Sequence, residues 1–491
     1  MLSAQPSGNL RLYEQKWRSL GGYSNLAKLQ GTTSQPDAAA YCRIWPLGLL
    51  VVLPDAVARV RGRASSRTAR SVGRSAGAPA ALGATPPFTE QEALQWADLA
   101  QGTPLYVYAL PLVRARVAAV RKALQGLCEV WYTAKANSSP GLLRPLAAAC
   151  DGCDVSSAGE LRQAIACGFR PGSIGFTGPG KRLEELNLAA SVGCAVSLES
   201  LAEIAEAERA ASAVGSPLRC LVRVNPKERL GAFRAAVGGM PGPFGVPEAD
   251  LEAALGAVRK SPQLVPIGIH VHTGSMCTSE SALVRHWHQT LDLAARTSHL
   301  LPEDFVVNFG GGLGVVSPEQ KCLDLARFGK LACKMLRKFR SHFPQAKFVL
   351  EPGRYLVAEA GWLLCRVLRR LELADGEVWA VADAGISQFL LAAEALHHGG
   401  EAAPPIWNLS QAPTLGPRAT VCGPLCTPLD VLSRAPPPGV ATPAAAGVTA
   451  SVRPGDMLAV GHAGAYAFST APHGALGHDR PAELVLEAGA K

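Results

Sequence analysis

The chain has 491 residues, of which 48% are hydrophobic and 18% charged, a balance typical of a soluble globular protein with two or three domains. Its formal charge of +9 does not indicate a nucleic-acid-binding face. Residues 1–85 hold eleven basic and three acidic groups, so this segment accounts for +8 of the +9 and the rest of the chain is nearly neutral. Thirteen cysteines, odd in number and scattered through a long chain, argue against a disulfide scaffold.

The first 95 residues form a basic extension rich in Ala, Arg and Ser. Residues 57–87 contain no acidic group, which is typical of an organelle transit peptide; a disordered extension or a misassigned start are the alternatives. The apolar run 44–53 is too short to span a bilayer. We therefore predict a protein without a membrane span, cytoplasmic or, if the extension is a transit peptide, plastid or mitochondrial.

Short β-rich runs alternate with amphipathic helical patterns from about residue 125. Each of eight predicted strands is followed by a helix, which predicts a (β/α)8 barrel over residues 100–360. In such a barrel, reactive side chains gather at the C-terminal ends of the strands. The predicted strands cover residues 129–135, 153–157, 173–178, 194–200, 218–224, 266–274, 305–311 and 347–353.

A second, mainly β domain is predicted over residues 361–491, where strand-like runs are separated by Pro-rich and Gly-rich loops. Residues 104–109 are expected to add a strand. Within the barrel region, Cys150 and Cys153 have the spacing of a redox or zinc motif. No second pair follows at a finger-like distance, so we interpret these two cysteines as structural.

Reactive residue types follow several of the predicted barrel strands. Taken singly, a terminal lysine, a histidine pair or a glycine turn is common in surfaces and packing. Their joint placement at one face predicts a site. The residues are Lys135 after the first strand, His272 and Ser275 after the sixth, Gly310, Gly311 and Gly312 after the seventh, and Glu351 and Arg354 after the eighth.

These groups suit the chemistry of pyridoxal phosphate. A lysine amine can link covalently to the cofactor's aldehyde. A glycine turn, a hydroxyl and a cation supply what a phosphate needs, and a carboxylate such as Glu351 keeps the ring nitrogen protonated. His272 is expected to lie on the ring face. This chemistry requires no metal.

Nine motifs follow one another along the chain: "YTAKAN", "DVSSAGEL", "FTGPGK", "RVNP", "HVHTGS", "GGGLG", "EPGRYLV", "GPLCTPLD" and "GHAGAY". This ordered set resembles the fold type III pyridoxal-phosphate decarboxylases, which include diaminopimelate, ornithine and arginine decarboxylases. The resemblance extends from about residue 100 to the C-terminus and implies an alanine-racemase-like barrel followed by a β domain. It also implies a homodimer whose active sites lie at the subunit interface.

The resemblance also implies roles for single residues. Lys135 matches the lysine that holds the cofactor, and Cys426 matches the cysteine that reaches over from the other subunit to protonate Cα. Glu351 matches the partner of the ring nitrogen and His272 the ring-stacking histidine. Ser275, Gly312, Arg354 and Tyr466 match the phosphate ligands.

The substrate side departs from the best-known members. Asp383, Thr427 and Asp430 are the substrate-side positions that the resemblance assigns. Where diaminopimelate and ornithine decarboxylases have an acidic residue after the cysteine, this chain has Thr427, and a hydroxyl cannot neutralise a distal ammonium. Further departures are Pro243 before Phe244, and His397 with His398. The form "GPLCTPLD" resembles members that act in specialised metabolism, including on carrier-bound amino acids.

Two alternatives to an amino-acid decarboxylase stay open from the sequence. A racemase on the same fold would use a tyrosine of the second domain as a base and would not need Cys426. A non-catalytic relative that binds the cofactor or regulates a partner would be expected to lose site residues, whereas this chain retains Lys135, Glu351, Arg354, Cys426 and Tyr466.

Overall fold

The computed structural model describes residues 86–315, 322–392, 404–436 and 447–487. Most of the predicted N-terminal extension, with its possible transit peptide, lies outside the described residues, and so do His397 and His398. No helix in these ranges is long and apolar enough to cross a membrane.

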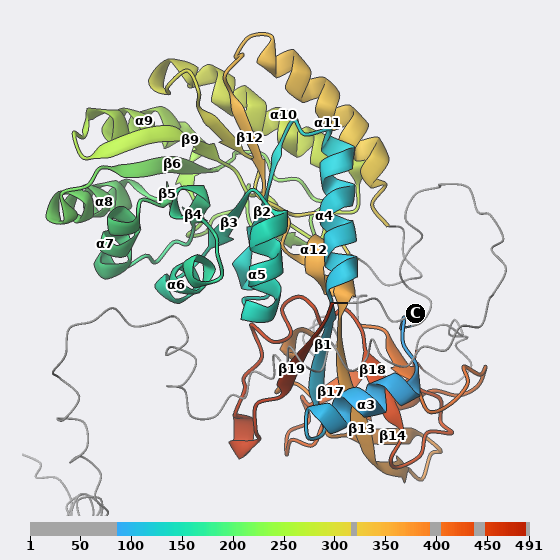
Figure 1. Cartoon of the computed structure of the whole chain (residues 1–491). Coiled ribbons are helices and arrows are strands. Elements are labelled where there is room, and N and C mark those ends of the chain that lie inside the picture. Colours follow the sequence, from blue (N-terminus) through green and yellow to red (C-terminus); the bar gives the residue numbers. More distant parts are fainter. Residues whose placement is uncertain (1–85, 316–321, 393–403, 437–446, 488–491) are drawn as a thin grey trace, which may run out of the picture. The chain divides into compact units, whose positions relative to one another are not determined.

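Eight parallel strands close into a barrel, as the sequence predicted (Figure 1). The pairing runs from β2 through β3, β4, β5, β6, β9, β11 and β12 back to β2. Parallel strands covered on both faces read as apolar runs, and all four residues of β5 are buried. The strands are β2 (Glu129–Thr133), β3 (Gly152–Val155), β4 (Ile174–Phe176), β5 (Ala195–Leu198), β6 (Leu218–Asn225), β9 (Leu264–His270), β11 (Val306–Asn308) and β12 (Lys347–Leu350).

Helices surround the barrel strands (Figure 1). Helix α8 illustrates their local signals: the Ser200 side chain accepts from the Glu203 N–H at its start, and Gly215 ends it with a left-handed backbone. The helices are α4 (Leu110–Leu124), α5 (Pro140–Ala149), α6 (Ala158–Ala166), α7 (Leu183–Val192), α8 (Leu201–Val214), α9 (Leu251–Lys260), α10 (Glu280–Arg296) and α11 (Leu325–Arg340), with short strands β7 (Ala235–Ala236), β8 (Val246–Pro247) and β10 (Gly274–Ser275) in the loops.

The C-terminal part is a mainly β domain, and the predicted combination of barrel and β domain is confirmed. Its sheet order is β15-β18-β13-β14-β16-β17, and β1 pairs with both β13 and β19. The N-terminal strand β1 therefore belongs to this sheet. Helix α12 (Arg354–Val357) connects the barrel to this domain, whose strands are β1 (Leu105–Ala109), β13 (Gly361–Glu372), β14 (Val378–Ala382), β15 (Ile406–Asn408), β16 (Ala419–Cys422), β17 (Val431–Ser433), β18 (Met457–Val460) and β19 (Ala482–Leu486).

Helix α3 (Glu90–Leu99) packs on the β domain, although its first residues fall within the 95-residue extension that the sequence suggested. Thr89 and Glu92 form a capping box at its start. Phe88 makes edge contacts with Trp96 at 5.0 Å and Trp362 at 5.2 Å between ring centroids. The boundary at residue 95 therefore lies inside a packed helix, because these aromatic side chains bury against strands distant in sequence.

An aromatic cluster in the barrel supports the glycine turn after β11. Trp287 of α10 stacks on Phe309 with ring centroids 4.0 Å apart, and Phe328 of α11 meets Trp287 edge-on at 5.2 Å. Such rings bury large apolar areas in fixed orientations. The residue that precedes Gly310 is thereby fixed by two helices.

Candidate active site

A cavity of about 390 Å³ lies at the C-terminal ends of the barrel strands and reaches a loop of the β domain. It brings together side chains that the sequence placed after different strands. Of the predicted cofactor residues, Lys135, His272, Ser275, Gly311, Gly312, Glu351, Arg354 and Tyr466 line the cavity. Gly310 is the first residue of the same glycine turn.

Lys135 lies in a 3-10 turn, η2 (Ala134–Ala136), that directly follows β2. The β domain holds this turn by its backbone: Tyr466 N donates to Ala136 O at 2.7 Å, and Ser469 Oγ donates to Lys135 O at 2.9 Å. Asn137 Nδ2 donates to Gly464 O at 3.1 Å. The position of the Lys135 backbone therefore depends on both domains.

The charges around Lys135 keep its amine protonated before any reaction. Burial lowers the pKa of Lys135, but the negative charge of Asp154 opposes burial and the net pKa lies above its usual value. Glu351 acts in the same direction and Arg223 in the opposite one. The amine is accessible from the cavity and can meet a ligand there.

Glu351 follows β12 directly and is buried beneath the cavity. Asn308 Nδ2 donates to Glu351 Oε1 at 2.6 Å, and Glu351 N donates to Gly310 O at 2.7 Å. Burial, followed by the charge of Asp154, raises the pKa of Glu351 to about 8. A carboxyl group with this pKa can hold or share a proton near neutral pH.

His272 lies against the glycine turn, and the turn leaves no room for side chains there. Gly311 N donates to His272 Nδ1 at 3.2 Å, so that nitrogen carries no proton. Burial, and then the charges of Lys135 and Arg223, lower the pKa of His272 well below its usual range. The imidazole is therefore neutral, with its proton on Nε2. Gly310 has φ +61°, and a Cβ there would approach His272 Nδ1 to 2.7 Å.

A second group of residues forms a cradle suited to an anion. The Arg354 guanidinium lies 4.4 Å from the centroid of the Tyr466 ring, and its Nε is buried with no hydrogen-bond partner among the described residues. Gly312 has φ +98°, with Gly274 O where a side chain would begin. Tyr466 itself has a left-handed backbone, φ +55°. Such backbone strain concentrates at ligand sites.

Among the cavity-lining residues that sequence reasoning missed are the acidic, basic and imidazole side chains of Asp154, Arg223 and His270. Arg223 Nη1 donates to both carboxylate oxygens of Glu199 at 2.9 Å. Asp154 Oδ1 accepts from Thr177 Oγ1 at 2.8 Å. The sequence signal that could have found Asp154 and Arg223 is a charged residue within a predicted strand, in "DVSS" and "RVNP". A buried charge is rare without a partner, so a charge in a buried strand indicates a functional or paired group.

Cys426 and Thr427 do not line the cavity of this chain. They lie between β16 and β17, where Cys426 is exposed and Thr427 half-buried. Thr427 N donates to Leu425 O at 2.8 Å, which places the pair at a tight turn. The Cys426 thiol is thus available to a molecule outside this chain.

Asp383 and Asp430, the other substrate-side residues predicted, also lie outside the cavity. Asp383 Oδ2 accepts from Thr103 Oγ1 at 2.5 Å and its Oδ1 from Arg366 N at 2.8 Å. Asp430 is 2% exposed and accepts at 2.7 Å from two backbone N–H groups, those of Ile386 and Leu425. Both carboxylates are engaged inside the β domain.

The cavity thus has a lysine, a carboxyl group with a raised pKa, a neutral histidine and an anion cradle on a parallel barrel. The unpartnered Arg354 Nε and the glycine turn fit a phosphate, and Lys135 fits an aldehyde. These features define a pyridoxal-phosphate-dependent enzyme.

Comparisons with known proteins agree with this class. Residues 110–358 match the family model described as the pyridoxal-dependent decarboxylase, pyridoxal binding domain. The chain belongs to this family, and it is a pyridoxal-phosphate-dependent amino-acid decarboxylase.

Three relatives illustrate the similarity. An L-glutamyl-[BtrI acyl-carrier protein] decarboxylase from Niallia circulans is 31% identical over 79% of this chain and 89% of its own length. A diaminopimelate decarboxylase from Methanothermobacter thermautotrophicus is 30% identical over 81% of this chain and 90% of its own. The structure of a diaminopimelate decarboxylase from M. jannaschii with L-lysine has a TM-score of 0.71 at 25% identity, covering 80% of this chain and 89% of that one.

Proposed function

We propose that this enzyme removes the α-carboxylate of an amino acid whose distal end carries no charge, such as an amino acid held by a carrier protein. For α-decarboxylation at a lysine-linked cofactor, both the α-amine and the α-carboxylate must be free. A carrier therefore has to be joined through the side-chain carboxyl as a thioester. That linkage neutralises the distal end of the substrate.

The observation that carries this proposal is the position of the carboxylates. Among the described residues that line the cavity, the carboxylates are Asp154 and Glu351, and both are buried among the cofactor residues. Asp383 and Asp430 already accept hydrogen bonds elsewhere. The residue beside Cys426 is the neutral Thr427. A distal ammonium would lack a partner from this set, at a substantial desolvation cost.

A relative at 31% identity that acts on a carrier-bound glutamyl group gives independent support. Diaminopimelate decarboxylases lie at similar identity, so their substrates are the alternatives that the experiment below includes.

Each residue of the site would have a separate role in the reaction. When bound, pyridoxal phosphate supplies an electron-accepting ring for the electron pair that stays on Cα when carbon dioxide leaves. Lys135 would bind the cofactor's aldehyde, and the Arg354, Ser275 and glycine-turn groups its phosphate. Glu351, whose burial raises its pKa to about 8, has a proton to share with the ring nitrogen. Neutral His272 would cover the ring without adding charge.

We further propose a homodimer in which Cys426 of the partner subunit completes each site. The Cα–carboxylate bond breaks, and a proton from the thiol takes the place of carbon dioxide on Cα, which yields the amine. Two observations support a contribution from the partner: Cys426 is exposed, and it does not line the cavity of its own chain.

The test is release of carbon dioxide by purified protein with pyridoxal phosphate. The substrates would be a γ-glutamyl thioester of pantetheine, the same group on an acyl carrier protein, free L-glutamate, meso-diaminopimelate, L-ornithine, L-lysine and L-arginine. Lys135→Ala is the blank. We expect release from the thioesters well above that from the free diamino acids. Faster turnover of any free diamino acid would contradict the proposed substrate class while leaving the decarboxylase activity intact.

A further inference from the structure

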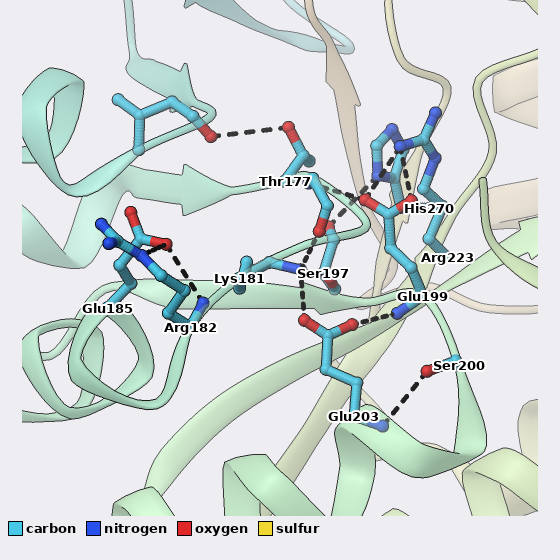
Figure 2. Close-up of polar contacts among 12 residues, drawn as sticks. Thr177, Lys181, Arg182, Glu185, Ser197, Glu199, Ser200, Glu203, Arg223 and His270 are labelled. Atoms are coloured by element: carbon cyan, nitrogen blue, oxygen red, sulfur yellow. Dashed lines mark hydrogen bonds and ion pairs between the residues drawn. The ribbon is translucent and has the colours of Figure 1, made fainter. Parts of the chain in front are cut away.

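Lys181 is a buried lysine that lies behind the wall of the cavity. Its side chain is 2% exposed, and its amine donates three hydrogen bonds: to Gly178 O at 2.7 Å, Ser197 O at 2.8 Å and Glu203 Oε1 at 2.6 Å. Figure 2 shows the amine between Ser197 and Glu203. A buried ammonium is tolerated only when paired and hydrogen-bonded, so these three partners fix its position.

A first branch leads from Lys181 to Arg223 in the cavity wall (Figure 2). Glu203 Oε2 accepts from Glu199 N at 2.7 Å. The Glu199 carboxylate in turn accepts from Arg223 Nη1 at 2.9 Å and from Gly178 N at 2.6 Å. Gly178 therefore uses both its backbone groups in this network. The Glu199 carboxylate therefore holds the Arg223 guanidinium, while the Glu199 backbone N–H is held by Glu203, the ion-pair partner of Lys181.

A second branch leads from Lys181 to His270. The Ser197 carbonyl accepts from Lys181, and the Ser197 hydroxyl lies 3.1 Å from His270 Nδ1. The other ring nitrogen, Nε2, lies 3.5 Å from Glu351 Oε2 and has no hydrogen-bond partner among the described residues. Burial lowers the pKa of His270 well below its usual range, so this ring is a neutral neighbour of Glu351.

Both branches end at residues that act on Glu351, the carboxyl that we expect to meet the ring nitrogen: His270 lies 3.5 Å from it, and Arg223 acts through its charge. Arg223 favours the ionised form of Glu351 and thereby opposes the burial that raises its pKa to about 8. A displaced guanidinium would let Glu351 keep its proton to higher pH. The charged or titratable groups that interact with Glu351 are Lys135 after β2, Cys153 and Asp154 on β3, Arg223 on β6 and His270 on β9, and His272 lines the same cavity.

We propose that Lys181 is a positioning residue for the cofactor site: its single amine fixes Arg223 through Glu203 and Glu199, and His270 through Ser197. It does so without lining the cavity. The proposal concerns the pyridoxal-phosphate site itself and does not depend on which substrate the enzyme uses.

The test uses the full chain with Lys181→Met and Glu203→Gln combined. The single change would leave the Glu203 carboxylate buried without its cation, whereas the pair removes both charges and retains an acceptor for Glu199 N. We expect the dissociation constant of pyridoxal phosphate to rise about tenfold, as for other supporting hydrogen-bond partners of a bound group. The pH dependence of this dissociation constant should move to higher pH, while the melting temperature of the protein changes little.

A matched control is Arg121→Met with Asp151→Asn. Arg121 also donates three hydrogen bonds, two to Ala149 O and one to Asp151 Oδ1 at 2.9 Å, and neither residue lines the cavity. The affinity of this control variant for pyridoxal phosphate should stay at the wild-type value. Equal weakening by the control pair would show a general loss of stability and overturn the proposal, as would wild-type affinity and pH dependence in the Lys181 pair.

Two further variants keep the test decisive if the Lys181 pair does not fold. Ser197→Ala cuts the His270 branch and leaves the carbonyl for Lys181, and Glu199→Gln weakens the Arg223 branch. Each should raise the dissociation constant of pyridoxal phosphate, and together they should raise it more than either alone. Wild-type affinity in both single variants and in their combination would contradict the proposal.

Discussion

At the scale of single residues, Thr427 is the position where a small change should alter substrate choice. It follows the exposed Cys426, and within the described parts of the chain its hydroxyl accepts one hydrogen bond, a long one of 3.4 Å from Leu429 N, so little structure depends on it. A carboxylate there would supply the counter-charge that a distal ammonium needs.

We therefore predict that Thr427→Glu increases kcat/KM for free diamino acids by about tenfold relative to the thioester substrate, since one charge-assisted contact contributes about 1.5 kcal/mol. Competition assays with both substrates present measure this ratio directly. Thr427→Gln, which has similar size but no charge, is the control. An unchanged ratio in both variants would show that the residue after Cys426 does not contact the distal group.

Glu351 makes the stability of the cofactor-free protein depend on pH. An unfolded glutamate has a pKa of about 4.3, whereas burial raises the pKa of Glu351 to about 8 in the folded state. Between these values the folded state keeps a proton that the unfolded state releases. The free energy of unfolding therefore falls as pH rises, by at most about 1.4 kcal/mol per pH unit for one group.

We predict that Glu351→Gln flattens this dependence. Melting temperatures of the cofactor-free wild type should fall more steeply between pH 5 and pH 8 than those of the variant. Burial also raises the pKa of Asp154, so some slope should remain in Glu351→Gln. Parallel curves for the two proteins would mean that Glu351 is ionised throughout this range.

At the scale of elements, each strand end positions one chemical group, and the glycine turn after β11 is the most constrained. Gly312 has φ +98°, and a Cβ added there would lie 2.5 Å from the carbonyl oxygen of Gly274. Any side chain there has to displace the β10 backbone next to Ser275.

We predict that Gly312→Ala weakens pyridoxal phosphate binding by at least about tenfold, because it moves two phosphate-binding elements apart and costs about 1–2 kcal/mol in backbone strain alone. Gly172→Ala is the control, since Gly172 has no atom within 4 Å of a Cβ and an ordinary φ. Absorbance titration with the cofactor measures both. Equal affinities would exclude the glycine turn from the phosphate site.

The elements also show which features the sequence could predict. Alternation of β-rich runs with amphipathic helices was enough to place Lys135, His272 and Glu351 at strand ends, because each lies within two residues of the end of its strand. The partners of Asp383 and Asp430 were not predictable, since Thr103 lies 280 positions and Ile386 44 positions away in the chain. Arg223 and Glu199 likewise find each other only once β5 and β6 are neighbours in the barrel.

At the scale of the whole molecule, one chain holds the predicted cofactor residues in a cavity but keeps Cys426 outside it. The resemblance predicts a cysteine that reaches over from another subunit, whereas the 291 positions between Lys135 and Cys426 by themselves give no sign of it. We propose that the two residues meet between two chains. A symmetric dimer would place two such exchanged cysteines, one at each site.

Mixed dimers test this arrangement. If Lys135→Ala and Cys426→Ala chains are unfolded together in equal amounts and refolded, half of the dimers should be mixed, and each mixed dimer should have one site with both residues intact. Because that is one site in four overall, we predict that about a quarter of the wild-type rate of amine formation returns, although each variant alone forms little amine. Refolding each variant separately before mixing is the control. If Cys426 instead served its own chain, no site in a mixed dimer would be complete and mixing would restore nothing.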